Sequence, residues 1–245
     1  MLVKKRATTE GVGSSRFLFL GCALLALAAL YPILGYGRMG LTVWTVTFWG
    51  VLLAAVHAVG HQPRVRLLAR VLGGAALVAG MTGVACFDLL GSAQPWALAS
   101  INLLTLLFLL LATGAVLVAV LSSERIGLDD LIGAASAYVL LGLTFTYAFL
   151  VLHDFVGGAI LVGEGELCRS LESVLDAQLA DYLYYSFVSL TTLGFGDLTP
   201  GSLEARALTG VEATLGQLFL AVLIARLVGM HVVSNTSYLA RGAGK

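Results

Sequence analysis

Charged side chains are scarce in this sequence. Only 11% of its 245 residues are Asp, Glu, Lys or Arg, whereas 59% are hydrophobic, and the mean hydropathy is +0.95. A soluble domain has about 25% charged and about 45–50% apolar residues. So few charges cannot cover a water-soluble globule of this size, and the composition therefore excludes a soluble enzyme and a disordered chain. It also argues against a nucleic-acid-binding protein, which needs a basic patch.

Cysteine and metal-ligating residues are equally sparse. The three cysteines, Cys22, Cys86 and Cys168, form no CxxC pair and no disulfide framework. The four histidines are scattered without the spacing of metal ligands. We therefore expect no metal centre and no cofactor.

Long apolar runs, in contrast, are abundant. Six of them are nearly free of charge, at residues 17–35, 41–60, 71–90, 97–121, 131–152 and 207–230. Each is close to or above the roughly 20 residues that a helix needs to cross a bilayer. A shorter semi-apolar segment at 182–190 cannot span. The pattern predicts an all-α, polytopic membrane protein with six transmembrane helices and one half-length segment.

The basic residues predict the orientation of these spans, because cytoplasmic loops carry an excess of Lys and Arg. With the N-terminus inside, eleven of the fourteen basic residues fall on the cytoplasmic side: Lys4, Lys5, Arg6, Arg16, Arg64, Arg66, Arg70, Arg125, Arg226, Arg241 and Lys245. We therefore expect a multi-pass protein of the cell membrane with both termini in the cytoplasm. The region between the last two spans is then extracellular and acidic, and its helix-like run at 171–179 predicts a small cap. Cys168 precedes this run, where a bridge to a neighbouring subunit and a free thiol are both open.

A glycine-rich segment follows the half-length stretch. Its residues are Thr191, Thr192, Leu193, Gly194, Phe195, Gly196 and Asp197. We predict a re-entrant helix that enters the membrane from outside and stops partway, followed by irregular chain that returns to the same side. Irregular backbone at membrane depth is stable only where it is buried in protein or lines a water-filled path. Alternate glycines permit conformations that point successive carbonyls in one direction, and such carbonyls can replace the hydration shell of a cation.

This segment resembles the selectivity filter of the tetrameric potassium-channel family, which is Thr-Thr-Val-Gly-Tyr-Gly-Asp or a close variant. Leu193 and Phe195 are the two departures from that pattern. The resemblance implies that Thr192, Leu193, Gly194 and Phe195 form the K⁺ sites, and that Gly196 and Asp197 shape the outer mouth. It also implies a re-entrant pore helix, here with Tyr184, Tyr185 and Phe187, in which the two tyrosines match the family's aromatic pair.

A single chain carries one such segment, and four are needed to surround an ion. We therefore expect a homotetramer with cyclic symmetry in the lipid bilayer. Potassium is the permeant ion of this assembly and not a cofactor.

Three residues of the last span, Gly216, Glu212 and Arg226, are unusual for a membrane helix or match a position of the resembled family. Gly216 lies 21 residues after Phe195, at the position of the glycine hinge in the inner helix of the resembled family. A bending point and a site of close helix packing are both open for it. Glu212 lies one turn earlier on the same face, and we expect it behind the pore helix, protonated or with a hydroxyl or amide partner, because a carboxyl group within the membrane is costly. Arg226 is expected to reach lipid headgroups or an acidic linker residue such as Glu124, Asp129 or Asp130.

The fourth apolar run, residues 97–121, contains no Lys or Arg. Voltage-sensing helices carry regularly spaced arginines that move in the membrane field. We therefore predict that the protein is not voltage-gated. The expected organisation is a cytoplasmic N-terminus at 1–16, a four-helix domain at 17–121, a linker at 122–130, a pore domain at 131–231 and a cytoplasmic tail at 232–245.

The sequence thus favours a potassium-selective channel that conducts passively, and not an enzyme. Two alternatives stay open. One is a non-selective cation channel, and the other is a non-conducting sensor or accessory subunit built on a channel scaffold.

Overall fold

The computed structural model describes residues 16–30, 43–51, 54, 71, 73–75, 78, 94–122, 128–157, 159–162, 165–166 and 174–242. Much of the predicted spans at 41–60 and 71–90 lies outside these residues, as do Cys168 and Glu124. The helices are α1 (Arg16–Ala29), α4 (Gln94–Leu121), α5 (Leu128–Val156), α6 (Val174–Leu190) and α7 (Leu203–Gly242). The strands are β1 (Ile160–Val162), β2 (Gly165–Glu166) and β3 (Leu198–Pro200).

Three of the described helices are long and apolar enough to cross a membrane. The candidate spans are Pro95–Leu121, Asp129–Val156 and Leu203–Arg226. They coincide with the predicted fourth, fifth and sixth spans, and the protein is a helical membrane protein. In α1, the apolar stretch is the shorter Phe17–Leu27.

Local sequence explains where these helices begin and end. Pro95 lies in the first turn of α4, where its missing N–H group would have no helical partner. Asp129 and Asp130 lie in the first turn of α5, near the positive end of the helix dipole. Gly157 follows the last residue of α5 with a φ of 71°, and its N–H donates to the carbonyl of His153 at 2.9 Å. A glycine with positive φ commonly ends a helix in this way.

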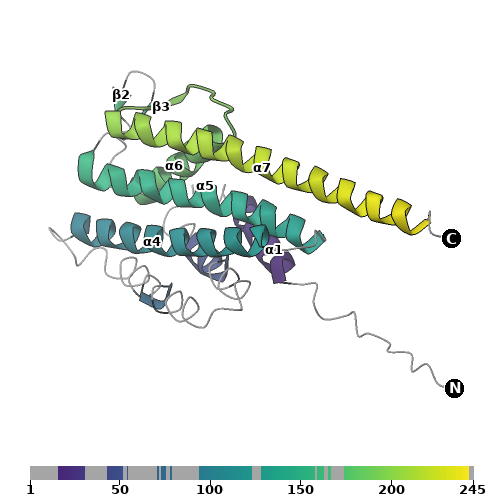
Figure 1. Cartoon of the computed structure of the whole chain (residues 1–245). Helices are drawn as coiled ribbons and strands as arrows, with labels where there is room; N and C mark the ends of the chain where they lie inside the picture. Colours follow the sequence, from purple (N-terminus) through teal and green to yellow (C-terminus); the bar gives the residue numbers. More distant parts are fainter. Residues whose placement is uncertain are drawn as a thin grey trace.

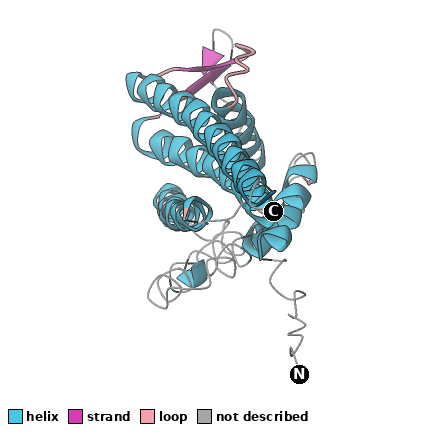
Figure 2. Cartoon of the chain, turned by 45° about the vertical axis from the view of Figure 1, so that its right-hand side comes forward, coloured by secondary structure: helices cyan, strands magenta, loops and turns pink. Residues whose placement is uncertain are grey.

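The long helices lie side by side, with α5 between α4 and α7 (Figure 1). α5 returns along α4 after a short connection, and α7 then runs back along α5. α6 is short and lies against α5 and α7 near one end of the bundle, which we call the strand end because β1, β2 and β3 lie there (Figures 1 and 2). α7 has 40 residues and continues beyond the other helices. Residues 232–242, predicted as part of a tail, therefore extend the same helix.

Helix α1 packs against the beginning of α5. The N–H of Phe17 donates to Asp129 Oδ1 at 3.2 Å, which satisfies one of the free amides at the start of α1. A Cβ atom on Gly133 would lie 2.9 Å from the Phe17 ring, and one on Gly21 would lie 2.8 Å from Ile132. Small residues permit such close approach where van der Waals contact drives helix association in lipid.

A small sheet that the sequence did not predict accompanies the helices. Its three strands are antiparallel in the order β2-β1-β3, and Leu161 pairs with both Glu166 and Thr199. These strands are two or three residues long, too short to show the alternating pattern by which strands are recognised in a sequence. The sheet joins the chain that follows α5 to the chain that precedes α7.

Candidate functional site

The predicted pore helix is the C-terminal half of α6. The sequence indicated two pieces, a cap helix at 171–179 and a short helix at 182–190, whereas the structure has one helix over Val174–Leu190. No glycine or proline lies between the two predicted pieces, so nothing breaks the helix there. At 1.5 Å per residue its 17 residues extend for about 26 Å, less than the roughly 30 Å of a hydrocarbon core.

The segment after α6 has an unusual backbone. Positive φ angles occur at every second residue, with 56° at Thr192, 59° at Gly194 and 80° at Gly196. Leu193 and Phe195 between them have negative φ. When residues of opposite handedness alternate, successive N–H groups face one side of the chain and successive carbonyls the other. The glycines therefore permit the row of carbonyls that the sequence predicted, and Thr192 adopts the same conformation although it carries a side chain.

Side chains of α6 hold this segment at its outer residues. The hydroxyl of Tyr184 donates to Asp197 Oδ2 at 2.8 Å. The ring of Phe195 stacks on that of Tyr184, with the centroids 6.4 Å apart and the planes at 3°. Phe195 has no hydroxyl, and ring stacking connects it with α6.

The strands hold the chain that leaves this segment. β3 begins at Leu198, directly after Asp197, and pairs with β1 along its whole length. The N–H of Gly201 extends this pairing by donating to the carbonyl of Ala159 at 3.0 Å. The segment from Thr191 to Asp197 is thus fixed between α6 on one side and the sheet on the other.

One face of α7 supports α6 and the segment. Along this face the hydroxyl of Thr209 shares a hydrogen bond of 2.6 Å with Tyr185, Glu212 Oε1 lies 2.5 Å from Ser186 Oγ, and Gln217 Nε2 donates to Thr192 Oγ1 at 3.1 Å. We call Thr209, Glu212, Gly216 and Gln217 the support face of α7. Their spacing of three, seven and eight residues from Thr209 places them on one side of a helix.

Gly216 lies where α7 meets the end of α6. A Cβ atom at this position would lie 2.3 Å from the carbonyl oxygen of Leu190 and 3.0 Å from its side chain. The same carbonyl accepts a hydrogen bond of 3.2 Å from the hydroxyl of Tyr138 on α5. α7 is continuous through Gly216, so the geometry favours close packing as the reason for a glycine here.

Sequence reasoning found Glu212 and Gly216 and expected a hydroxyl or amide partner for Glu212, but it did not identify Ser186 as that partner or the other hydroxyls around the two residues. Ser186, Thr209 and Tyr138 all lie within apolar stretches, where a single hydroxyl gives no signal of its own. Helical spacing from Glu212 could have indicated Thr209, because the two lie three residues apart and face the same neighbour.

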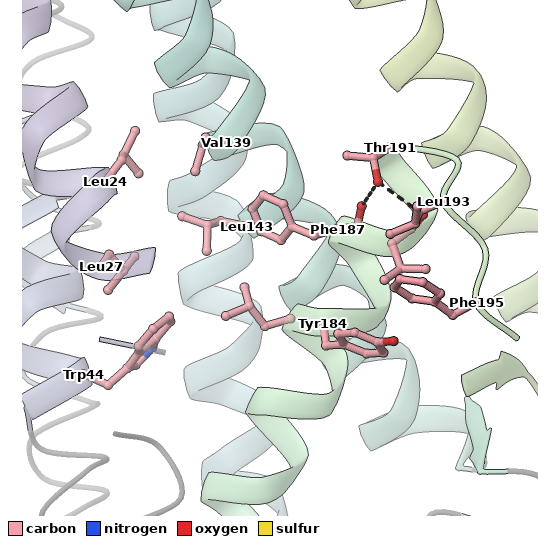
Figure 3. Close-up of a pocket in the computed structure, with 12 residues that line it drawn as sticks. Leu24, Leu27, Trp44, Val139, Leu143, Tyr184, Phe187, Thr191, Leu193 and Phe195 are labelled. Carbon is pink, nitrogen blue, oxygen red and sulfur yellow. Dashed lines mark hydrogen bonds between the residues drawn. The ribbon is translucent and has the colours of Figure 1, made fainter. Parts of the chain in front are cut away.

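An apolar pocket of about 380 Å³ adjoins the segment on the side of α1 (Figure 3). Leu193, Phe195 and Tyr184 form one wall, and Leu24, Leu27 and Trp44 lie across from them. None of the described residues that line it is charged. An ion would lose its hydration there without compensation, so this space is no conduction path, but it places the first helices beside the predicted filter.

Arg226 bonds a partner that the sequence did not suggest. Its Nη1 donates to the backbone carbonyl of Val120, near the C-terminal end of α4. The last carbonyls of a helix lack helical donors and carry its partial negative charge, and both properties favour a cation. This bond links α7 with α4.

Comparison with known proteins gives one result. Residues 148–232 match the family model described as “Ion channel”. No curated protein and no solved structure matches the chain. The match covers the end of α5, the sheet, α6, the glycine-rich segment and most of α7.

These residues form an ion-channel pore domain. The matching family is one of channels and not of enzymes, which agrees with the composition. Channels of this family typically assemble as oligomers. This pore domain includes the Thr191–Asp197 segment together with Tyr184, Ser186, Glu212 and Gly216.

Proposed function

We propose that the protein is a potassium-selective channel that conducts K⁺ passively through a homotetrameric pore. The observation that carries this proposal is the backbone of the Thr191–Asp197 segment, where positive φ alternates along a sequence that matches the potassium filter at five of seven positions. The segment lies at the C-terminal end of a helix too short to span, between two candidate spans. In this arrangement both termini are cytoplasmic and the filter faces outside.

The chemistry of conduction follows from the oxygens of the segment. Backbone carbonyls from Thr192 to Phe195 replace water around a K⁺ ion, and four copies complete its shell. The hydroxyl of Thr192 donates to the carbonyl of Thr191 at 2.7 Å and accepts from Gln217, which leaves one lone pair for an ion. The C-terminal end of α6 directs its partial negative charge toward the segment, which favours a cation.

The exposure of the single chain supports an assembly of four. All residues from Thr191 to Asp197 are exposed, and Phe195 is 65% accessible. Exposed apolar side chains continue along α7, including Leu215, Leu218 and Val222. Lipid can cover the apolar residues of α7, but carbonyls that bind a dehydrated ion need further copies around the same axis.

A flux experiment in liposomes tests the proposal. The purified protein is reconstituted, tetramers are established by crosslinking, and the reversal potential is measured with equal K⁺ and Na⁺ on opposite sides. Selective conduction gives a reversal potential displaced far from zero, with the K⁺-containing side negative. A tetramer that passes no K⁺ over a range of pH, Ca²⁺ and membrane tension would instead support a non-conducting sensor or accessory subunit.

A non-selective cation channel is the second candidate, and Phe195 favours it. The residue lacks the hydroxyl with which a tyrosine would tie the filter to the pore helix, and only ring stacking on Tyr184 takes its place in the described contacts. A more compliant filter discriminates less between cations. A reversal potential near zero in the same experiment would establish this candidate. If Phe195→Tyr then displaced the reversal potential from zero, with the K⁺-containing side negative, the missing hydroxyl would be the cause of the poor selectivity.

A further inference from the structure

Glu212 is buried inside the pore domain. Its exposed fraction is 0%, although most of the neighbouring α7 surface is accessible. Oε1 lies 2.5 Å from the hydroxyl oxygen of Ser186 on α6, and Oε2 accepts no hydrogen bond among the described residues. A buried polar group without a partner is costly, so the protonation of this carboxyl group decides how well it fits.

Ser186 has two acceptors and one proton. Its Oγ lies 2.8 Å from the carbonyl oxygen of Gly142 on α5 and 2.5 Å from Glu212 Oε1. A carbonyl can only accept, and a serine hydroxyl can donate only once. Two short oxygen–oxygen contacts need two protons, and a protonated Glu212 supplies the second one. The helices are close here, since a Cβ atom on Gly142 would lie 2.8 Å from the Phe187 ring.

The described surroundings of Glu212 supply no counter-ion for a carboxylate. Among the residues that the structure describes, no ion pair joins Glu212 to Lys, Arg or His. The titratable groups near Glu212 are Tyr138 on α5 and Tyr185 on α6. Their hydroxyls bond the carbonyl of Leu190 and the hydroxyl of Thr209. An ionised carboxylate in this apolar setting would lack both a counter-ion and a second donor.

We infer that Glu212 is a positioning residue that carries a proton in the conducting arrangement: it donates to Ser186, Ser186 donates to Gly142, and the two hydrogen bonds tie α7, α6 and α5 together behind the filter. Its effect on conduction rests on the proposed function. When Glu212 loses its proton, only the hydroxyl proton of Ser186 remains for the two oxygen–oxygen contacts. The contact that then has no proton becomes repulsive. The support of the pore helix is thus complete at low pH and is lost as pH rises through the titration of Glu212.

The test combines infrared spectroscopy with a pH profile of K⁺ flux. Full-length wild-type and E212Q proteins are compared in liposomes below about pH 10, where tyrosines begin to titrate. Glutamine keeps an N–H donor for Ser186 but has no titratable proton. H153Q and D154N serve as controls, because both residues belong to the outer end of α5 and Asp154 bonds Asn102. Difference spectra of the folded protein show whether a protonated carboxyl band disappears in E212Q.

We expect a carboxyl band at neutral pH in the wild type and its loss in E212Q. Wild-type flux falls roughly fivefold at alkaline pH, the equivalent of one hydrogen bond of about 1 kcal/mol, whereas E212Q shows no such fall and both controls retain it. Identical spectra in wild type and E212Q would overturn the inference, and so would the same alkaline fall of flux in both. If neither protein conducts but the carboxyl band is lost in E212Q, the proposed function is wrong, whereas the inference that Glu212 is protonated and bonds Ser186 is supported.

Discussion

Two helix contacts in this protein differ in kind. α4 and α5 belong to one apolar core that includes Leu109 and Leu140, and among the described residues two polar pairs join them, the buried hydroxyls of Thr113 and Thr144 at 3.0 Å and the exposed Asn102 and Asp154 at 2.9 Å. α7 meets α6 through the support face, where two side-chain pairs and a bare glycine set the spacing. Van der Waals packing tolerates a substitution of similar volume, whereas a hydrogen-bonded contact fails when one partner is removed. The first contact therefore holds helices together, and the second determines where the proposed filter lies.

The filter glycines allow the strongest test of this difference. Gly194→Ala or Gly196→Ala should abolish most K⁺ flux, because an L-residue in the left-handed region costs about 1–2 kcal/mol and four subunits share the change. No atom lies within 4 Å of a Cβ at either position, so the effect comes from the backbone conformation and not from a clash. Liposome flux at matched protein density measures it.

Gly210→Ala is the matched control for this prediction. This glycine lies within α7, also has no atom within 4 Å of a Cβ, and does not have a positive φ. Alanine there should preserve flux and stabilise the helix by up to about 1 kcal/mol. If the filter variants conducted as well as Gly210→Ala, the assignment of the filter would be wrong.

Gly216→Ala should produce the next largest effect. The Cβ of the new alanine would lie 2.3 Å from the carbonyl oxygen of Leu190. No side-chain rotation relieves this clash, because one atom is a Cβ and the other belongs to the backbone. We expect the free energy of unfolding to fall by about 1–3 kcal/mol, as in other overpacked sites, with a lower unfolding temperature of the tetramer and reduced flux. Thermal unfolding followed by size-exclusion chromatography measures the stability.

The same variant distinguishes packing from bending. A hinge that only needed flexibility would be stiffened by alanine, and the protein would then be as stable as the wild type or more stable, with altered opening. An unchanged or raised unfolding temperature in Gly216→Ala would therefore contradict the packing explanation and favour the hinge.

Much of the candidate site could be predicted from the sequence, because its main segment is formed by consecutive residues. The Thr191–Asp197 segment is contiguous, so its glycine spacing alone indicated a special backbone at Gly194 and Gly196, where φ is positive, whereas the positive φ of Thr192 was not predicted. The identity of the hydroxyl that bonds Glu212 and the carbonyl that bonds Arg226 could not be predicted, because Ser186 is 26 residues away from Glu212 and Val120 is 106 residues away from Arg226. A hydroxyl or a backbone carbonyl in an apolar run has no pattern that points to a distant helix. The small sheet was missed for a related reason, since its pairing joins residues on either side of α6.

The threonine pair between α4 and α5 should matter far less than the support face. Thr113→Val or Thr144→Val alone should destabilise the protein by about 1 kcal/mol, because each leaves one buried hydroxyl with a lost partner. The double variant should be less destabilised than the sum of the two, since it removes both hydroxyls and conserves volume. A double-mutant cycle on unfolding temperature measures the coupling, and flux per tetramer should not change. A loss of flux as large as that in Gly216→Ala would mean that the two contacts are not different in kind.

Membrane voltage should have the smallest effect of all. α4 contains no Lys or Arg along its 28 residues, so moving it through the membrane field would transfer no side-chain charge. A gating charge is worth about 2.3 kcal/mol per 100 mV, and steep opening needs several of them. The bond from Arg226 to Val120 joins α4 to α7 near the end of α4, and there it can transmit a mechanical displacement but not a charge movement. In planar bilayers the open probability should vary weakly with voltage, and Arg226→Gln should alter the open probability at every voltage by a similar factor. Steep voltage-dependent opening that survives in Arg226→Gln would show that some other part of the chain carries the gating charge.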